Sequence, residues 1–135
     1  MAIVMSLQTV GSFLLYFGVA LVAMALFLAL YMAVTSHHEA ALIKQGNTAA
    51  AISLGGALLG FTLPLASAIV HSLSLVDMAV WSAIALVVQL VAFKAVDLAL
   101  REVSRRIEQG NVAAGTTLAA GSLAIGVVNA ACMTY

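Results

Sequence analysis

Four long apolar stretches, separated by short polar ones, divide the chain. They run from about Val10 to Val34, Thr48 to Val70, Val76 to Leu98 and Val112 to Met133. Each has about 20 residues or more, enough for a helix to cross the roughly 30 Å hydrocarbon core of a bilayer. Lipid offers no partner to backbone N–H and C=O groups, so each stretch is expected to be helical. The pattern predicts an all-α membrane protein with four transmembrane helices.

Composition supports the same class. Of 135 residues, 64% are hydrophobic and 7% are charged, with a mean hydropathy of +1.18. A soluble domain needs more charge to cover its surface. The first stretch lacks a basic start and is longer than a signal-peptide core, so it is interpreted as a retained helix. No linker interrupts the short loops, and we expect residues 1–135 to form one membrane domain.

The basic residues predict the orientation in the membrane. All five belong to two segments, Lys44 and the region from Lys94 to Arg106. These segments follow the first and third stretches, whereas the second loop and both termini have no lysine or arginine. The positive-inside rule therefore predicts that both basic segments face the cytoplasm and that both termini of this multi-pass protein lie outside it. No basic surface continues along a soluble face, so nucleic acid is not an expected partner.

The two cytoplasmic loops repeat one another. The segment Ile43–Ala50 matches Ile107–Ala114, 64 positions later, including a Gln-Gly-Asn sequence in each. Glycine accepts the left-handed backbone that closes a helix, and the asparagine that follows can cap the next helix. Each copy contains two spans, so both insert in the same sense. We therefore expect two parallel-repeated helical hairpins, about 1–71 and about 72–135, packed around a pseudo-twofold axis.

The third helix is expected to continue past the membrane. Asp97 and Arg101, and Glu102 and Arg106, stand four positions apart, a spacing that favours ion pairs on a helix. About two further turns would then extend into the cytoplasm. This extension offers a face to a soluble partner, and its residues are Arg101, Glu102, Arg105 and Arg106.

Small and polar residues form a stripe on the second span. Their spacings of three and four positions place them on one helix face. Pro64 removes a backbone donor and crowds the carbonyl of Gly60, which predicts a kink. Such a stripe can be a close helix–helix contact or the lining of a path for ions or solutes, and the contact is the commoner use. Its residues are Ser53, Gly56, Gly60, Pro64 and Ser67.

A similar face follows on the fourth span, with Gly115, Ser122, Gly126 and Asn129. Helix packing is the favoured interpretation here too. Gln89, on the third span, is the most deeply placed strongly polar side chain. It is equally consistent with a hydrogen bond between helices and with a polar path.

No catalytic motif is present, and we predict neither an enzyme nor a cofactor. His37 and His38 are adjacent, which is the wrong spacing for a helical pair of metal ligands. His71, Asp77 and Cys132 could meet at the outer surface, but three mixed ligands there are a weak case, and no metal site is predicted. The single cysteine excludes an internal disulfide.

Several segments resemble one family of bacterial membrane proteins. They are 47–51, 60–66, 77–81 and 129–135, with the sequences NTAAA, GFTLPLA, DMAVW and NAACMTY. Together they are similar to the YjfL-like inner-membrane proteins, known as domain of unknown function 350. The resemblance implies a four-span bacterial protein built from two repeats. It assigns no activity, although such proteins are often encoded near membrane-stress proteins of the phage-shock type.

Two hypotheses for the function follow. The first is an oligomeric envelope scaffold or stress-associated membrane component that recruits a soluble cytoplasmic partner. The second is a homo-oligomeric channel or small-solute transporter whose path is lined by the kinked second span and by Gln89. Both assume contact with the lipid bilayer, and both predict a homo-oligomer, because two small-residue faces offer more interface than one bundle uses.

Overall fold

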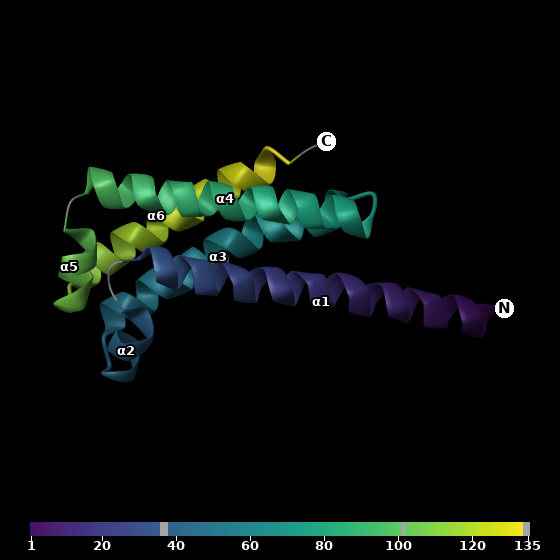
Figure 1. Cartoon of the computed structure of the whole chain (residues 1–135), viewed down its shortest axis with the longest axis horizontal. Coiled ribbons are helices and arrows are strands. Elements are labelled where there is room, and N and C mark those ends of the chain that lie inside the picture. The colour runs from purple at the N-terminus through teal and green to yellow at the C-terminus, as the bar shows by residue number, and fades with distance from the viewer. Residues whose placement is uncertain (36–37, 101, 134–135) are drawn as a thin grey trace.

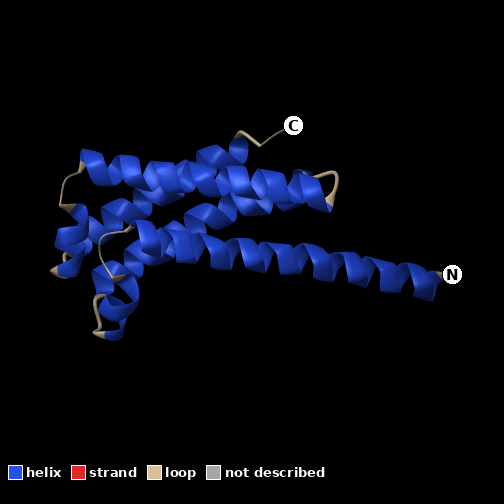
Figure 2. Ribbon diagram, viewed as in Figure 1, coloured by secondary structure: helices blue, strands red, loops and turns tan. Residues whose placement is uncertain are grey.

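The computed structural model describes residues 1–35, 38–100 and 102–133, and the described part contains only helices and loops (Figures 1 and 2). Four helices are long and apolar enough to cross a membrane, and this confirms the predicted fold class. Two short helices form corners between them. The elements are α1 (Ala2–Val34), α2 (Glu39–Lys44), α3 (Thr48–His71), α4 (Leu75–Ala99), α5 (Val103–Glu108) and α6 (Val112–Ala131).

The first helix begins eight residues earlier than its hydropathy predicts. It starts at Ala2 rather than near Val10. Two polar side chains in these first turns bond back to their own helix. The Ser6 hydroxyl donates to the carbonyl of Ala2, and the Thr9 hydroxyl donates to the carbonyl of Met5, each at 2.9 Å. Their polarity lowers the local hydropathy without interrupting the helix.

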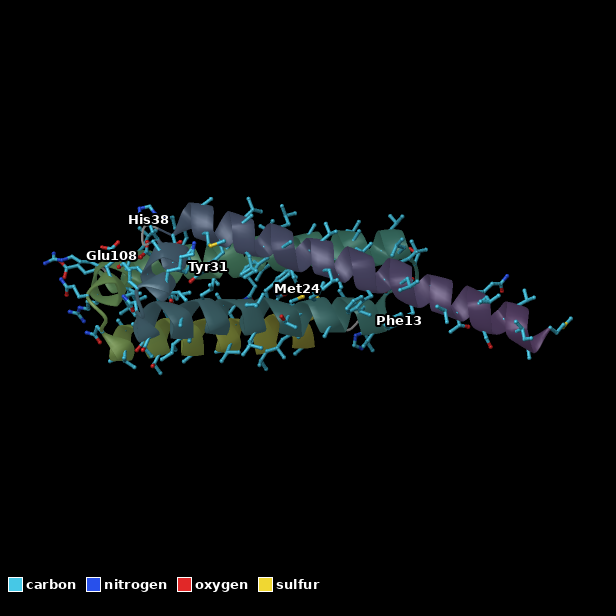
Figure 3. The ribbon with its side chains drawn as sticks, turned by 90° about the horizontal axis from the view of Figure 1, so that it is seen from below. Phe13, Met24, Tyr31, His38 and Glu108 are labelled. Atoms are coloured by element: carbon cyan, nitrogen blue, oxygen red, sulfur yellow. The ribbon has the colours of Figure 1, made fainter. Side chains whose placement is uncertain are left out.

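The long helices form two layers. The helices α3 and α6 make the closest contact in the described chain; α4 packs against both of them, and α1 packs against α3 and α4. Figure 3 shows α1 along the upper edge, with α3 and α6 below it. Helices α1 and α4 contact each other, so they lie on the same side of the α3–α6 pair. The expected pseudo-twofold axis would place them on opposite sides of that pair. The two hairpins, α1–α3 and α4–α6, therefore lie side by side in the same orientation.

The two corners have the backbone that their sequences predict. Gly46 has φ +83° and Gly110 has φ +80°, so both occupy the left-handed region where glycine carries no Cβ penalty. Asn47 accepts a hydrogen bond from the amide of Ala50, and Asn111 accepts one from the amide of Ala114. The predicted helix ends and caps are confirmed at both places.

The predicted extension of the third span is wrong. The helix α4 ends at Ala99, and Glu102 adopts a left-handed backbone with φ 77° before α5 begins at Val103. The turn lets Val103 and Ile107 pack under the corner, where they are 6% and 0% exposed. Burial of these two apolar side chains stabilises the turn. A straight helix that continued into water would leave them exposed. Arg101 lies outside the described residues.

Candidate functional site

The contact between α3 and α6 depends on glycines. A Cβ added to Gly56 would collide with the side chain of Ala119, and one added to Gly60 would collide with the backbone carbonyl of Ser122. Both glycines therefore lie where the two helix backbones approach too closely for any side chain. The small-residue face of α3 lies in this contact, which we call the α3–α6 seam.

The fourth span contributes glycines in the same way. A Cβ on Gly115 would strike the carbonyl of Ala49, and one on Gly126 would strike the carbonyl of Gly60. That Gly60 carbonyl is the group that Pro64 deprives of its usual helical donor. Helix α3 nevertheless continues to His71, and α6 covers the freed oxygen. This carbonyl is therefore enclosed by the seam.

Contacts along the seam show that α3 and α6 run parallel. Ala49 lies against Gly115 near one end, and Ser67 reaches Ala130 near the other, where its hydroxyl donates to the Ala130 carbonyl at 3.0 Å. Residue numbers thus rise together on both helices. Parallel packing agrees with two hairpins that insert into the membrane in the same sense.

The predicted polar residues bond to backbone within the bundle. Ser53 is fully buried and donates to the carbonyl of Ala50 at 3.0 Å. Gln89 is 4% exposed, and its Nε2 donates to the carbonyl of Ser122 at 3.3 Å. Asn129 Nδ2 lies 3.5 Å from the carbonyl of Ala85 on α4, at the outer limit for a hydrogen bond. The two amide contacts join α4 and α6.

The space beside Gln89 is small. Its Oε1 is buried and has no hydrogen-bond donor within the described chain. A cavity of about 10 Å³ adjoins it, between α4 and α6, and has room for about one water molecule. The cavity is lined by Gln89, Ala92, Phe93, Val96, Gly121, Ser122 and Ile125. Gln89 and Ser122 therefore lie at a nearly filled contact between α4 and α6.

Sequence reasoning missed a polar cluster at the α2–α5 end of the bundle. Tyr31 and Glu39 are each 1% exposed, and the carboxylates of Glu39 and Asp97 both act electrostatically on the Tyr31 hydroxyl. Asp97 also accepts from the Ser104 hydroxyl at 3.4 Å and lies 3.8 Å from the Lys94 ammonium. Adjacent polar residues at the membrane edge are the one signal that could have suggested the cluster.

The predicted cytoplasmic face belongs to α5. Glu102 pairs with Arg105 at 3.2 Å, three positions away, rather than with Arg106. Arg106 instead borders an open cavity of about 460 Å³ between the end of α4, α5 and the start of α6. The cavity is lined by Ala99, Leu100, Val103, Arg106, Asn111, Ala113, Ala114 and Thr117. Arg101, the fourth predicted residue of this face, lies outside the described residues.

The loop between α3 and α4 is a tight hairpin. Ser74 caps α4 by accepting from the amide of Asp77, and the Asp77 carboxylate accepts from the amide of Leu73. Among the described residues, no three histidine, cysteine, aspartate or glutamate side chains come close enough to hold a metal ion.

Comparison with known proteins places the chain among uncharacterised membrane proteins. It is 40% identical over 129 residues to the UPF0719 inner membrane protein YjfL of Escherichia coli strain K12, a match that covers 96% of this chain and 98% of the relative. The protein of the same name from Escherichia coli O157:H7 matches equally well. No solved structure shows a significant match.

The family match agrees with the four spans. Residues 5–133 match the family described as Domain of Unknown Function (DUF350), which is almost the whole chain. The similarity to inner-membrane proteins and the four candidate spans together identify a multi-pass inner-membrane protein. This chain belongs to the DUF350 family.

Proposed function

We propose that this protein is an inner-membrane scaffold that presents its α2 and α5 corners to a soluble partner in the cytoplasm. The filled α3–α6 seam is the observation that carries the proposal. Side chains or backbone of α6 occupy the space beside Gly56 and Gly60, and buried amide and hydroxyl groups bond to backbone carbonyls. A bundle built in this way supports a rigid platform rather than a path through one chain.

The distribution of charge supports the same role. The sequence has five basic and five acidic residues, and all of them except Asp77 belong to segments 39–44 and 94–108. In Figure 3, Glu108 and His38 mark this end of the molecule, and α1 carries apolar side chains away from it. Charged side chains on one end suit recognition of a soluble protein, because complementary charges steer association.

A photo-cross-linking experiment tests the recruiting role. A photoreactive amino acid at position 105 should capture one soluble protein in intact cells, and the same group at Val127, on the apolar surface of α6, should capture none. Replacing Arg101, Arg105 and Arg106 by glutamate should abolish capture by a group placed at Glu108, whereas replacing them by lysine should preserve it. Capture of lipid alone from every α5 position would contradict the proposal.

Flux measurements separate the scaffold from the channel. Liposomes that contain the purified protein should leak ions and small polyamines no faster than empty liposomes. Conductance that falls on substitution of Gln89→Leu would support the channel instead, because that amide is the deepest polar group beside the seam.

A further inference from the structure

Each helix of the seam leaves the opposite face uncovered. The repeat relates positions 64 apart, so the α3 seam residues Ala49, Ser53, Gly56 and Gly60 correspond to α6 residues Ala113, Thr117, Ala120 and Ala124. The first set is buried, and the second set is exposed. Helix α6 thus carries a second, unused version of the surface with which α3 meets α6.

The surface that would pack against this face of α6 is also present, on α3, and it makes no such contact within the described chain. The α6 seam residues Gly115, Ala119 and Gly126 correspond to Ala51, Gly55 and Thr62 on α3. Ala51 is exposed, and Gly55 and Thr62 are partly exposed. A Cβ on Gly55 would meet no atom of the described chain. Glycine weakens a helix interior relative to alanine, and nothing within one molecule requires it at this position.

The open cavity of about 460 Å³ is a third surface, after the two helix faces, that the described chain leaves uncovered. Its lining residues Val103, Asn111 and Ala114 correspond to Glu39, Asn47 and Ala50 at the other corner. That other corner is covered, because Asn47 Nδ2 donates to the carbonyls of Ile107 and Glu108 at 2.8 and 3.4 Å. Asn111 Nδ2 makes no corresponding bond within the described residues. The cavity therefore corresponds to a site on the first hairpin that α5 and α6 of the second hairpin fill.

We infer that copies of this chain associate head to tail, with the second hairpin of one copy packing against the first hairpin of the next as the two hairpins pack within one chain. Ala120 then lies against Gly55 of the next copy, as Gly56 lies against Ala119. Asn111 donates to the carbonyls of Ile43 and Lys44 in the next copy. Because the two hairpins have the same orientation, the same contact can repeat from one copy to the next. A twofold axis between the hairpins would not allow this repetition. Such heterologous contacts form rings or open rows.

This assembly depends on the membrane fold and not on the recruiting role proposed above. Its occupant is a second copy, because the matching surface is on the same chain and an intramolecular version of the contact already exists. The parallel direction of α3 and α6 suits neighbours inserted in the same sense. Lipid would be the alternative cover for both faces, and the experiment distinguishes the two.

Disulfide cross-linking in native membranes tests the contact. In a Cys132→Ser background, which removes the exposed native thiol, Ala120→Cys and Gly55→Cys are made in separate chains with tags of different size. Oxidation with copper phenanthroline should join the two chains when they are expressed together, since a disulfide requires Cα atoms within about 7 Å. Neither variant alone should form a dimer, because a head-to-tail contact never brings a residue against itself. The double variant should give a ladder.

The register has its own control. Thr62→Cys in place of Gly55→Cys lies on the same face but about 10 Å farther along α3, and it should not join to Ala120→Cys. Dimers from either single variant, or no product from the mixed pair, would overturn the inference. As a second measurement, Ala120→Leu with Ala124→Leu should convert the oligomer in mild detergent into a monomer by light scattering, with unchanged helix content. Wild-type protein that is already a monomer in native lipid nanodiscs would also overturn it.

Discussion

The two corners, at Gly46–Asn47 and Gly110–Asn111, have the same sequence pattern and the same backbone, yet they differ in what covers them. Asn47 caps α3 and also donates to the carbonyl of Ile107, whereas Asn111 caps α6 and borders an open cavity. Ala49 and Ala50 are fully buried, but Ala113 is exposed. Local sequence therefore determines the turn, and the neighbouring hairpin determines how many of its polar groups find partners inside the chain.

The sharpest way to test this difference is to enlarge equivalent residues on the covered and uncovered faces. Gly60→Leu should destabilise the fold by about 3 kcal/mol or more, because the new side chain meets the backbone of α6. Ala124→Leu, at the corresponding position on α6, should change stability by less than about 0.5 kcal/mol in a detergent that keeps the protein monomeric. Unfolding by denaturing detergent, followed by circular dichroism, measures both. Equal losses would contradict the assignment of covered and uncovered faces.

Removal of the two caps provides the next comparison. Asn111→Ala should cost about 1 kcal/mol, the usual value for a lost helix cap. Asn47→Ala should cost about 1 kcal/mol more, since it also loses the hydrogen bond to Ile107. The same unfolding experiment in monomeric detergent measures the difference, and indistinguishable values would mean that the second bond of Asn47 adds nothing.

Substitution of the two corner glycines should show that the corners have the same backbone. Gly46→Ala and Gly110→Ala should each cost about 1 kcal/mol, because both force a Cβ into a left-handed backbone. Apart from its sequence neighbours, neither new Cβ would have an atom of the described residues within 4 Å, so the costs should agree. Unequal melting temperatures of the two variants would show that the corners differ in backbone as well as in cover.

Apart from the Ala124→Leu comparison, the smallest expected effect concerns the amide beside the seam. Gln89→Leu removes the bond to Ser122 and should cost about 0.6 kcal/mol, the average for a hydrogen bond between membrane helices. Steric-trapping measurements in bicelles resolve changes of this size. A loss several times larger would indicate that the buried amide organises more of the bundle than this one contact.

The sequence predicted the features that depend on lipid and on local backbone. Four spans follow from hydropathy, and both corners follow from the Gly-Asn pairs, because a positive φ and a cap require little beyond the residues themselves. The seam glycines were also predictable, although periodicity alone could not show whether Gly60 and Pro64 face another helix or a path. That choice depends on the position of α6.

Features that depend on distant packing were not predictable. The charge spacing around Glu102 favours a continuous helix, but burial of Val103 and Ile107 selects a turn. A glutamate at the start of a short polar helix is expected in solvent, yet Glu39 is 1% exposed and acts electrostatically on Tyr31 of α1. Local sequence alone decides neither outcome, since each depends on how the second hairpin packs against the first.

The length of α1 affects the surrounding lipid. Its 33 residues span about 50 Å, whereas the apolar layer of a typical bilayer is about 30 Å thick. Figure 1 shows its N-terminal turns projecting beyond the rest of the bundle, and Ile3, Leu7 and Val10 are exposed there. The helix must therefore lean, thicken the lipid around it, or lift those turns into the headgroup region. Each response has a cost that changes with bilayer thickness, so the tilt of α1 should follow the length of the surrounding acyl chains.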